Sequence, residues 1–188
     1  MEDQFQIQVR FQGIRPIMFD KYAGDNNTAL EPRDKMYLRP DGAVCIPDLN
    51  ILSMLAAENT KSVTKVFYPP KQGVTLRHTL NSFLQISTNL IPISDEEGNL
   101  VVFNGKWTDK IFVHKSVARL AKGVPNPKER PCVETPWNLE FSINWMENKT
   151  ISIDNLMQMF KYAGVIGLGT FRPQFGQFTL EEWKVEKL

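Results

Sequence analysis

Two segments of this sequence alternate strictly between apolar and polar residues, one at 5–11 and one at 137–145. Successive side chains of a strand point to opposite faces of a sheet, so each segment is predicted to be a strand with one buried face. The residues expected to face inward are Phe5, Ile7, Val9, Phe11, Trp137, Leu139, Phe141, Ile143 and Trp145. The other face of the first segment suits solvent or a hydrogen-bonding ligand. It carries Gln4, Gln6, Gln8, Arg10 and Gln12.

Apolar residues recur at helical spacing in two other places. One helix is predicted over about 49–59, preceded by Asp48 as a suitable N-cap. A second helix is predicted over about 152–163, and it is expected to end at Gly164 as its C′ residue. Helices and strands therefore alternate along the chain, which favours a mixed architecture.

With further strands expected at 83–93 and 178–185, the element order is strand, helix, strand, strand, helix, strand. This order predicts an α+β fold, a ferredoxin-like (RRM-like) βαββαβ sandwich in which two helices cover one face of an antiparallel sheet. The chain is expected to form one domain, 1–188, with insertions at about 13–46 and 94–134. The second insertion is interpreted as a β-ribbon or thumb, since residues 111–117 alternate again.

Composition excludes several classes of protein. The hydrophobic fraction of 42% is too high for an intrinsically disordered chain, and no apolar run approaches the ~20 residues of a membrane span. The first residues alternate like a strand and lack the pattern of a signal peptide. Two isolated cysteines, Cys45 and Cys132, make neither a disulfide framework nor a zinc site. A reducing cytoplasm is therefore the expected compartment.

Basic residues are concentrated in two segments, although the formal net charge of the chain is only +1. Residues 61–78 contain four basic and no acidic residues, and residues 106–130 contain seven basic and two acidic ones. Proline and glycine interrupt 61–78 and 123–131, so both are expected to be loops. Basic segments with interleaved aromatics are typical of single-stranded nucleic-acid binding, whereas a solvated basic face is the simpler alternative. The candidate binding residues are Arg10, Lys61, Lys65, Phe67, Tyr68, Arg77, Trp107, Lys115, Arg119 and Arg172.

A glycine-rich segment, VIGLGTFRPQFGQF, follows the second predicted helix and contains Gly167, Gly169 and Gly176. Two interpretations remain open. Its backbone N–H groups suit an anion such as phosphate, and Arg172 favours that interpretation. Alternatively, the glycines allow a tight connection with positive φ angles. The segment joins a helix to a strand, the reverse of the order in nucleotide-binding folds.

His78 and His114 are the only histidines, and each is a weak candidate for a general base in RNA cleavage. A histidine without a catalytic role is the simpler interpretation, because no spacing places a second base or acid beside either one. No nucleophile elbow, P-loop or HExxH pattern occurs. No catalytic residue, metal site or cofactor is therefore assigned.

Three segments resemble the RAMP superfamily, the RRM-like proteins that include backbone subunits of CRISPR effector complexes. They are FQIQVRFQGIRPIMF at the start, VCIPDLNILSMLAA in the middle and AGVIGLGTFRPQFGQF near the end. The last also resembles small RAMP-like proteins of phages and mobile elements. After Pro47 the family commonly has Ser-Ser-Leu-Lys-Gly, whereas this chain has residues 48–52 without a lysine. The family's phosphate contact is therefore not carried over to this helix, and the catalytic histidine of its RNA-processing branch has no counterpart.

The resemblance implies a protein that binds single-stranded nucleic acid, with RNA favoured, and forms a homo-oligomer or multi-subunit complex along the strand. In the family, the helix and loops flanking the sheet hold RNA, and a ribbon insertion, here within 94–134, reaches the neighbouring subunit. It further implies antiviral defence or counter-defence, in the cytoplasm of a bacterium or a phage-infected cell, without a membrane partner. The alternatives are a metal-independent endoribonuclease using His78 or His114, and a phage protein-interaction module that mimics a subunit of a host defence complex.

Overall fold

The computed structural model describes residues 3–25, 27–119, 123 and 125–188, with the backbone alone described at 118 and 119. The strands are β1 (Gln4–Gly13), β2 (Ile17–Met18), β3 (Tyr37–Leu38), β4 (Val44–Pro47), β5 (Leu84–Ile86), β6 (Leu90–Ser94), β7 (Ile111–Arg119), β8 (Pro125–Val133), β9 (Asn138–Met146) and β10 (Phe178–Lys187). The helices are α1 (Asp48–Ala56), α2 (Val63–Val66), α3 (Pro70–Phe83) and α4 (Ile153–Ile166), with a 3-10 turn η1 (Pro32–Lys35). None of the described helices is long and apolar enough to cross a membrane.

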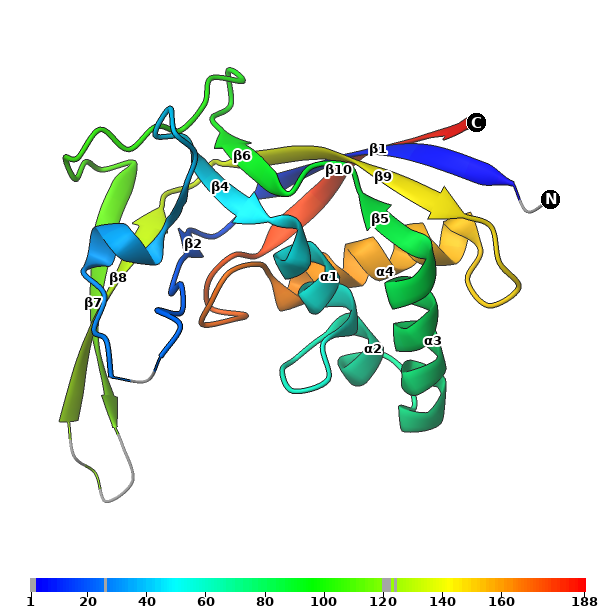
Figure 1. Ribbon diagram of the computed structural model, residues 1–188, viewed down its shortest axis with the longest axis horizontal. Coiled ribbons are helices and arrows are strands. Elements are labelled where there is room, and N and C mark those ends of the chain that lie inside the picture. Colours follow the sequence, from blue (N-terminus) through cyan, green and yellow to red (C-terminus); the bar gives the residue numbers. More distant parts are fainter. Residues whose placement is uncertain (1–2, 26, 120–122, 124) are drawn as a thin grey trace.

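The main sheet is antiparallel and has the order β10-β1-β9-β6-β4-β3, with β5 also paired to β9 (Figure 1). β1 lies between β9 and β10 over almost its whole length. The two alternating segments predicted from sequence are thus neighbours at the centre of the sheet. All of their predicted inward residues are buried except Phe5, which is partly buried and packs against the core. The chain therefore has a mixed α/β architecture with antiparallel sheets.

The helices cover one face of the main sheet (Figure 1). Phe11 of β1 stacks on Phe178 of β10 with ring centroids 4.0 Å apart, and Phe160 of α4 packs onto the same cluster. Ser152 is the N-cap of α4, and its hydroxyl accepts a hydrogen bond from the backbone N–H of Asn155 at 3.2 Å. The predicted N-terminus of this helix is therefore confirmed. Its end is not at Gly164, because the helix continues to Ile166.

Gly164 has a packing role instead. A Cβ atom at this position would lie 2.3 Å from the carbonyl oxygen of Phe178, so only glycine lets α4 approach β10 this closely. The helix ends one turn later at Gly167, which has a φ of +87°. A left-handed residue is the usual end of a helix, and here the second suitable glycine is used.

The segment 61–78, predicted as a loop, forms α2 and most of α3. The prolines do not interrupt α3 because Pro70 occupies its first turn, where a missing N–H costs nothing. Gly73 sits inside α3 where a Cβ would lie 2.2 Å from the carbonyl oxygen of Thr64. The residues that indicated a loop therefore start a helix and allow it to pack against α2.

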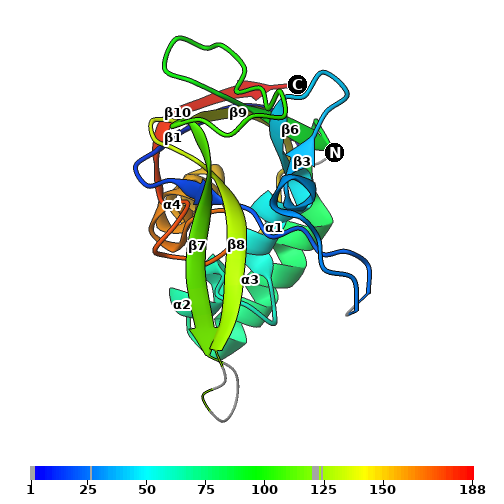
Figure 2. The same ribbon diagram turned by 90° about the vertical axis from the view of Figure 1, so that its left-hand side faces the viewer.

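The β7–β8 hairpin projects from one end of the main sheet, on the same side as the helices but apart from them (Figures 1 and 2). We call it the ribbon. Its second strand, β8, was predicted as a loop because it contains three prolines. Over most of its length β8 pairs only with β7, and β2 joins it at Cys132 and Val133. Proline is tolerated on such a strand because one of its edges needs no hydrogen bonds.

Candidate nucleic-acid interface

The basic residues of the first segment lie around α2 and α3. We call Lys61, Lys65, Lys71 and Arg77 the helical cluster. Among the described residues it forms one ion pair, with Glu58, whose carboxylate lies 3.5 Å from Arg77 and whose backbone oxygen accepts a hydrogen bond from Lys65 at 3.2 Å. Lys61 and Lys71 are exposed and form no ion pair within the described residues. Most of this positive charge therefore faces solvent.

Aromatic rings lie within the helical cluster. The Phe67 ring stacks in parallel on Tyr162 of α4, with centroids 4.4 Å apart, and Tyr68 contacts the same Tyr162 edge-on. Burial, and secondly the neighbouring Tyr162, raises the pKa of Tyr68. Phe67 and Tyr68, both predicted from the sequence, thus lie against one ring. That ring belongs to Tyr162, which was not predicted because its place in a helix with an apolar stripe indicated only packing.

The glycine-rich loop, residues 167–177, is a tightly packed connection. The glycines at 167, 169 and 176 all have positive φ angles. The N–H groups of Gly167, Leu168, Thr170 and Gly176 donate to backbone oxygens of the protein. These donors are therefore already satisfied, and the geometry favours the interpretation of the loop as a tight connection.

Arg172 extends from this loop toward the helical cluster. Its guanidinium donates to the carbonyl oxygen of Gly167 and to the hydroxyl of Thr60, both at 3.4 Å. Burial lowers the pKa of Arg172. Because Thr60 precedes Lys61, the guanidinium connects the two segments that the sequence predicted separately.

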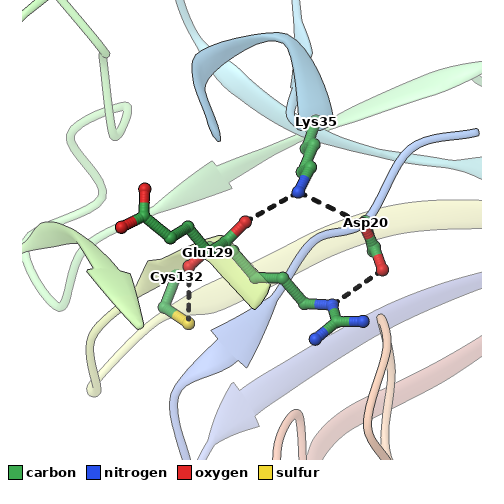
Figure 3. Close-up of polar contacts among 5 residues, drawn as sticks. Asp20, Lys35, Glu129 and Cys132 are labelled. Carbon is green, nitrogen blue, oxygen red and sulfur yellow. Dashed lines mark hydrogen bonds and ion pairs between the residues drawn. The ribbon is translucent and has the colours of Figure 1, made fainter. Parts of the chain in front are cut away.

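The charge of the ribbon is largely compensated. Lys115 pairs with Glu129 at 2.8 Å, and Arg130 pairs with Asp20 at 2.7 Å. Figure 3 shows that Asp20 also lies near Lys35, at 3.9 Å, and that Lys35 donates to the backbone oxygen of Glu129 at 2.7 Å. These contacts fasten the base of the ribbon to the first insertion.

Lys110 is also unavailable, because its ammonium group donates to the backbone oxygens of Glu134 and Pro136. Burial lowers the pKa of Lys110. Of the remaining basic residues of this segment, Lys106 and Lys128 form no ion pair within the described residues. The side chain of Arg119, a predicted binding residue, lies outside the described part, as does Lys122.

The ribbon meets the glycine-rich loop through four side chains. His114 and Arg130 are cross-strand partners and so share one face of the ribbon. The His114 ring meets Phe175 edge-on at 5.1 Å, and the Arg130 guanidinium lies over the Phe171 ring, 5.8 Å from its centroid. We call these four residues the loop–ribbon junction. Phe171, Phe175 and the role of Arg130 were not predicted, because the contacts join segments far apart in the sequence.

Two predicted residues lie away from these groups. Arg10 is on the sheet face opposite the helices, directly between Glu140 of β9 and Glu182 of β10 in register. That face is rich in amides and carboxylates, whereas sheets that bind RNA on a face do so with stacking aromatics. Trp107 packs against Phe103 with centroids 4.7 Å apart.

The two histidines lie on different elements. His78 is exposed on α3 and forms no hydrogen bond within the described residues. His114 is part of the loop–ribbon junction. No group of three or more His, Cys, Asp or Glu residues suited to hold a metal ion occurs in the described part of the chain.

No family model matches the sequence, and no curated protein matches it. The fold, in contrast, matches solved structures. One is a chain of a type III-B Cmr-beta complex, determined by cryo-EM bound to cognate target RNA, with a TM-score of 0.60 and 10% sequence identity. The match covers 98% of this chain and 61% of that chain, so the protein spans about three fifths of the length of its structural neighbour. At this identity the match establishes a likeness of fold alone.

Proposed function

We propose that this protein is a RAMP-like single-stranded nucleic-acid-binding protein, with RNA as the favoured ligand, that works within a homo-oligomer or multi-subunit complex. The observation that carries the proposal is a series of cationic and aromatic groups linked by direct contacts. It runs from the helical cluster through Arg172 to the loop–ribbon junction. Such alternation of charge and rings suits a strand whose phosphates need cations and whose bases need stacking surfaces.

The fold supports this proposal. The order β10-β1-β9-β6 is the order in which the fourth, first, third and second strands of a ferredoxin-like βαββαβ unit lie. On this interpretation residues 1–188 form one RAMP-like domain, and the ribbon is the thumb inserted between its second and third core strands. One solved structure with this fold is a chain of a type III-B Cmr-beta bound to cognate target RNA. By analogy we place the protein in the cytoplasm of a bacterium or a phage-infected cell.

The predicted residues contribute to different degrees. Lys61, Lys65, Arg77 and Arg172 are proposed phosphate contacts, and Phe67 and Tyr68 are proposed to face bases at the edge of the Tyr162 stack. Lys115 can contact a phosphate only when its ion pair with Glu129 opens. Arg10 can do so only when the bound nucleic acid reaches the amide-rich face of the sheet. The affinity should therefore depend mainly on the helices and the glycine-rich loop.

The direct test is fluorescence polarisation with labelled single-stranded RNA at two salt concentrations. We expect binding at low salt that weakens steeply as salt rises, because each neutralised phosphate contributes about 0.7 to the logarithmic salt slope. A matched single-stranded DNA measures the preference for RNA. Absence of binding at low salt, together with co-elution with a host protein complex free of nucleic acid, would replace this proposal with the protein-interaction module.

A further inference from the structure

Phe171 has an unusual backbone for an aromatic residue. Its φ is +60°, and it is the one non-glycine residue with a positive φ in the described part of the chain. The backbone is held on both sides, because the Thr170 N–H donates to Met18 and the Phe171 oxygen accepts from Phe175. A left-handed conformation is unfavourable for a bulky L-residue, and glycine occupies the neighbouring positive-φ positions of this loop. The fold alone therefore favours glycine at position 171.

The ring gains little from packing in exchange for this strain. Phe171 is 55% exposed, so more than half of its surface faces solvent. Strained conformations that persist at exposed positions are concentrated at ligand-binding sites. The observation therefore points to a ligand that uses the ring.

The ring is nevertheless held in a fixed environment. The guanidinium of Arg130 lies over it, and that guanidinium is fixed in turn by Asp20 at 2.7 Å. The Arg130 side chain is only 12% exposed, so its charge is directed at the ring and at Asp20. The cation–π attraction holds the ring in place, and a planar nucleobase can stack on an aromatic ring that is held and exposed in this way.

The charge next to the ring suits one kind of planar ligand. Arg172 follows Phe171 directly and reaches Thr60 at 3.4 Å, where the helical cluster begins. A nucleobase on Phe171 would thus have a cation in position for its own or the adjacent phosphate. An apolar protein side chain would use the ring but would have no use for these cations.

We propose that Phe171 is a stacking platform for one nucleobase of the bound strand, with Arg172 contacting the phosphate beside it. This inference rests on the proposed function and names a base-contacting residue within it. The stack makes the loop–ribbon junction sensitive to the presence of a base, whereas the lysines of the helical cluster respond to phosphates.

The test compares Phe171→Gly, Phe171→Leu and Phe171→Trp with the wild-type protein on two RNAs of equal length, one with bases throughout and one with abasic sites. We expect Phe171→Gly and Phe171→Leu to bind the first RNA roughly tenfold or more weakly, because one base–aromatic stack is lost. Phe171→Trp should retain affinity. On the abasic RNA all four proteins should bind alike, and more weakly than wild type binds the first.

The glycine variant separates binding from folding, because removal of strain should leave its melting temperature unchanged or raised. A loss of affinity in a protein of equal or higher stability cannot come from unfolding. If the wild-type protein binds RNA and Phe171→Gly binds each RNA with the wild-type affinity, the stacking platform is wrong and the proposed function stands. Equal weakening on both RNAs also contradicts stacking. A changed oligomeric state with unchanged RNA affinity would make the ring a protein contact, and failure of wild type to bind either RNA would overturn both proposals.

Discussion

The two basic segments of this chain look alike in sequence but differ in the structure. In the helical cluster only Arg77 is paired with a carboxylate, that of Glu58, and stacked aromatic rings lie close to the cluster. In the second basic segment Lys115 and Arg130 are paired with Glu129 and Asp20, Lys110 donates to backbone oxygens, and Lys106 and Lys128 are left unpaired among the described residues. Among the described side chains, the segment with more basic residues therefore offers no more unpaired lysines than the helical cluster, two in each case.

The attraction that a basic residue exerts on a phosphate therefore depends on whether its charge is already paired with a carboxylate. An exposed ion pair contributes about 0–1 kcal/mol to stability, yet it cancels the long-range attraction of a cation for phosphate. Arg130 of the ribbon uses its charge to hold the ribbon against Asp20 of the first insertion (Figure 3), and Lys115 is paired within the ribbon. The helical cluster has no comparable structural use for Lys61 and Lys71, which leaves them available for a ligand.

The largest effect is expected from neutralising the helical cluster. Lys61→Gln/Lys65→Gln/Lys71→Gln should lower affinity for single-stranded RNA by about a hundredfold at low salt and reduce the logarithmic salt slope by about two, since the proposed phosphate contacts of Lys61 and Lys65 and the unpaired charge of Lys71 are lost. Polarisation titrations at several salt concentrations measure both. Lys115→Gln in the ribbon is the matched control, and its affinity should change by less than about twofold because its charge is already paired. Equal losses per lysine in both segments would remove the distinction.

The next effect concerns the structural use of charge in the ribbon. Asp20→Ala leaves the nearly buried Arg130 without its partner and should lower the free energy of unfolding by about 1–2 kcal/mol. Denaturant unfolding measures the change. The control is Asp34→Ala, whose partner Arg33 is 71% exposed, and which should be neutral. An Asp20 variant as stable as wild type would show that the ribbon does not depend on this contact.

Much of the fold was predictable because burial follows a simple period. β1 and β9 alternate over their whole length, so their inward residues could be named from the sequence. The α3 helix and β8 could not be predicted, since Pro and Gly indicate a loop unless the neighbouring elements are known. Pro70 is tolerated because it lies at the start of a helix, and the prolines of β8 are tolerated because that strand is paired mainly on one side.

The site was less predictable than the fold. Lysines and aromatics of the helical cluster are close in sequence, so their grouping could be anticipated. The loop–ribbon junction depends on a positive φ at Phe171 and on a contact with Arg130 across the fold. Neither leaves a local pattern in the sequence, and the pairing of Lys115 with Glu129 depends on the register of β7 and β8.

A smaller effect is expected from Cys132, which lies buried at the base of the ribbon. Burial raises the pKa of this thiol to about 12 from an ordinary 9.0. Above pH 9 the unfolded chain loses this proton while the folded protein keeps it, so stability falls as pH rises between these two values. From pH 8 to pH 10 the wild-type protein should lose about 1 kcal/mol more than Cys132→Ala. Denaturant unfolding at both values measures the difference, and parallel pH dependences would mean that the thiol is not buried.

The smallest effect tests whether the ribbon carries masked charge. Glu129→Gln removes the partner of Lys115, so the freed ammonium should raise affinity for single-stranded RNA about two- to threefold at low salt. The free energy of unfolding should hardly change, because Lys115 and Glu129 are both exposed. Glu147→Gln is the control, since it changes the net charge equally at an exposed position without an ion pair in the described residues. Equal gains for both variants would attribute the effect to net charge, whereas a gain specific to Glu129 shows that pairing withholds the ribbon's charge from the strand.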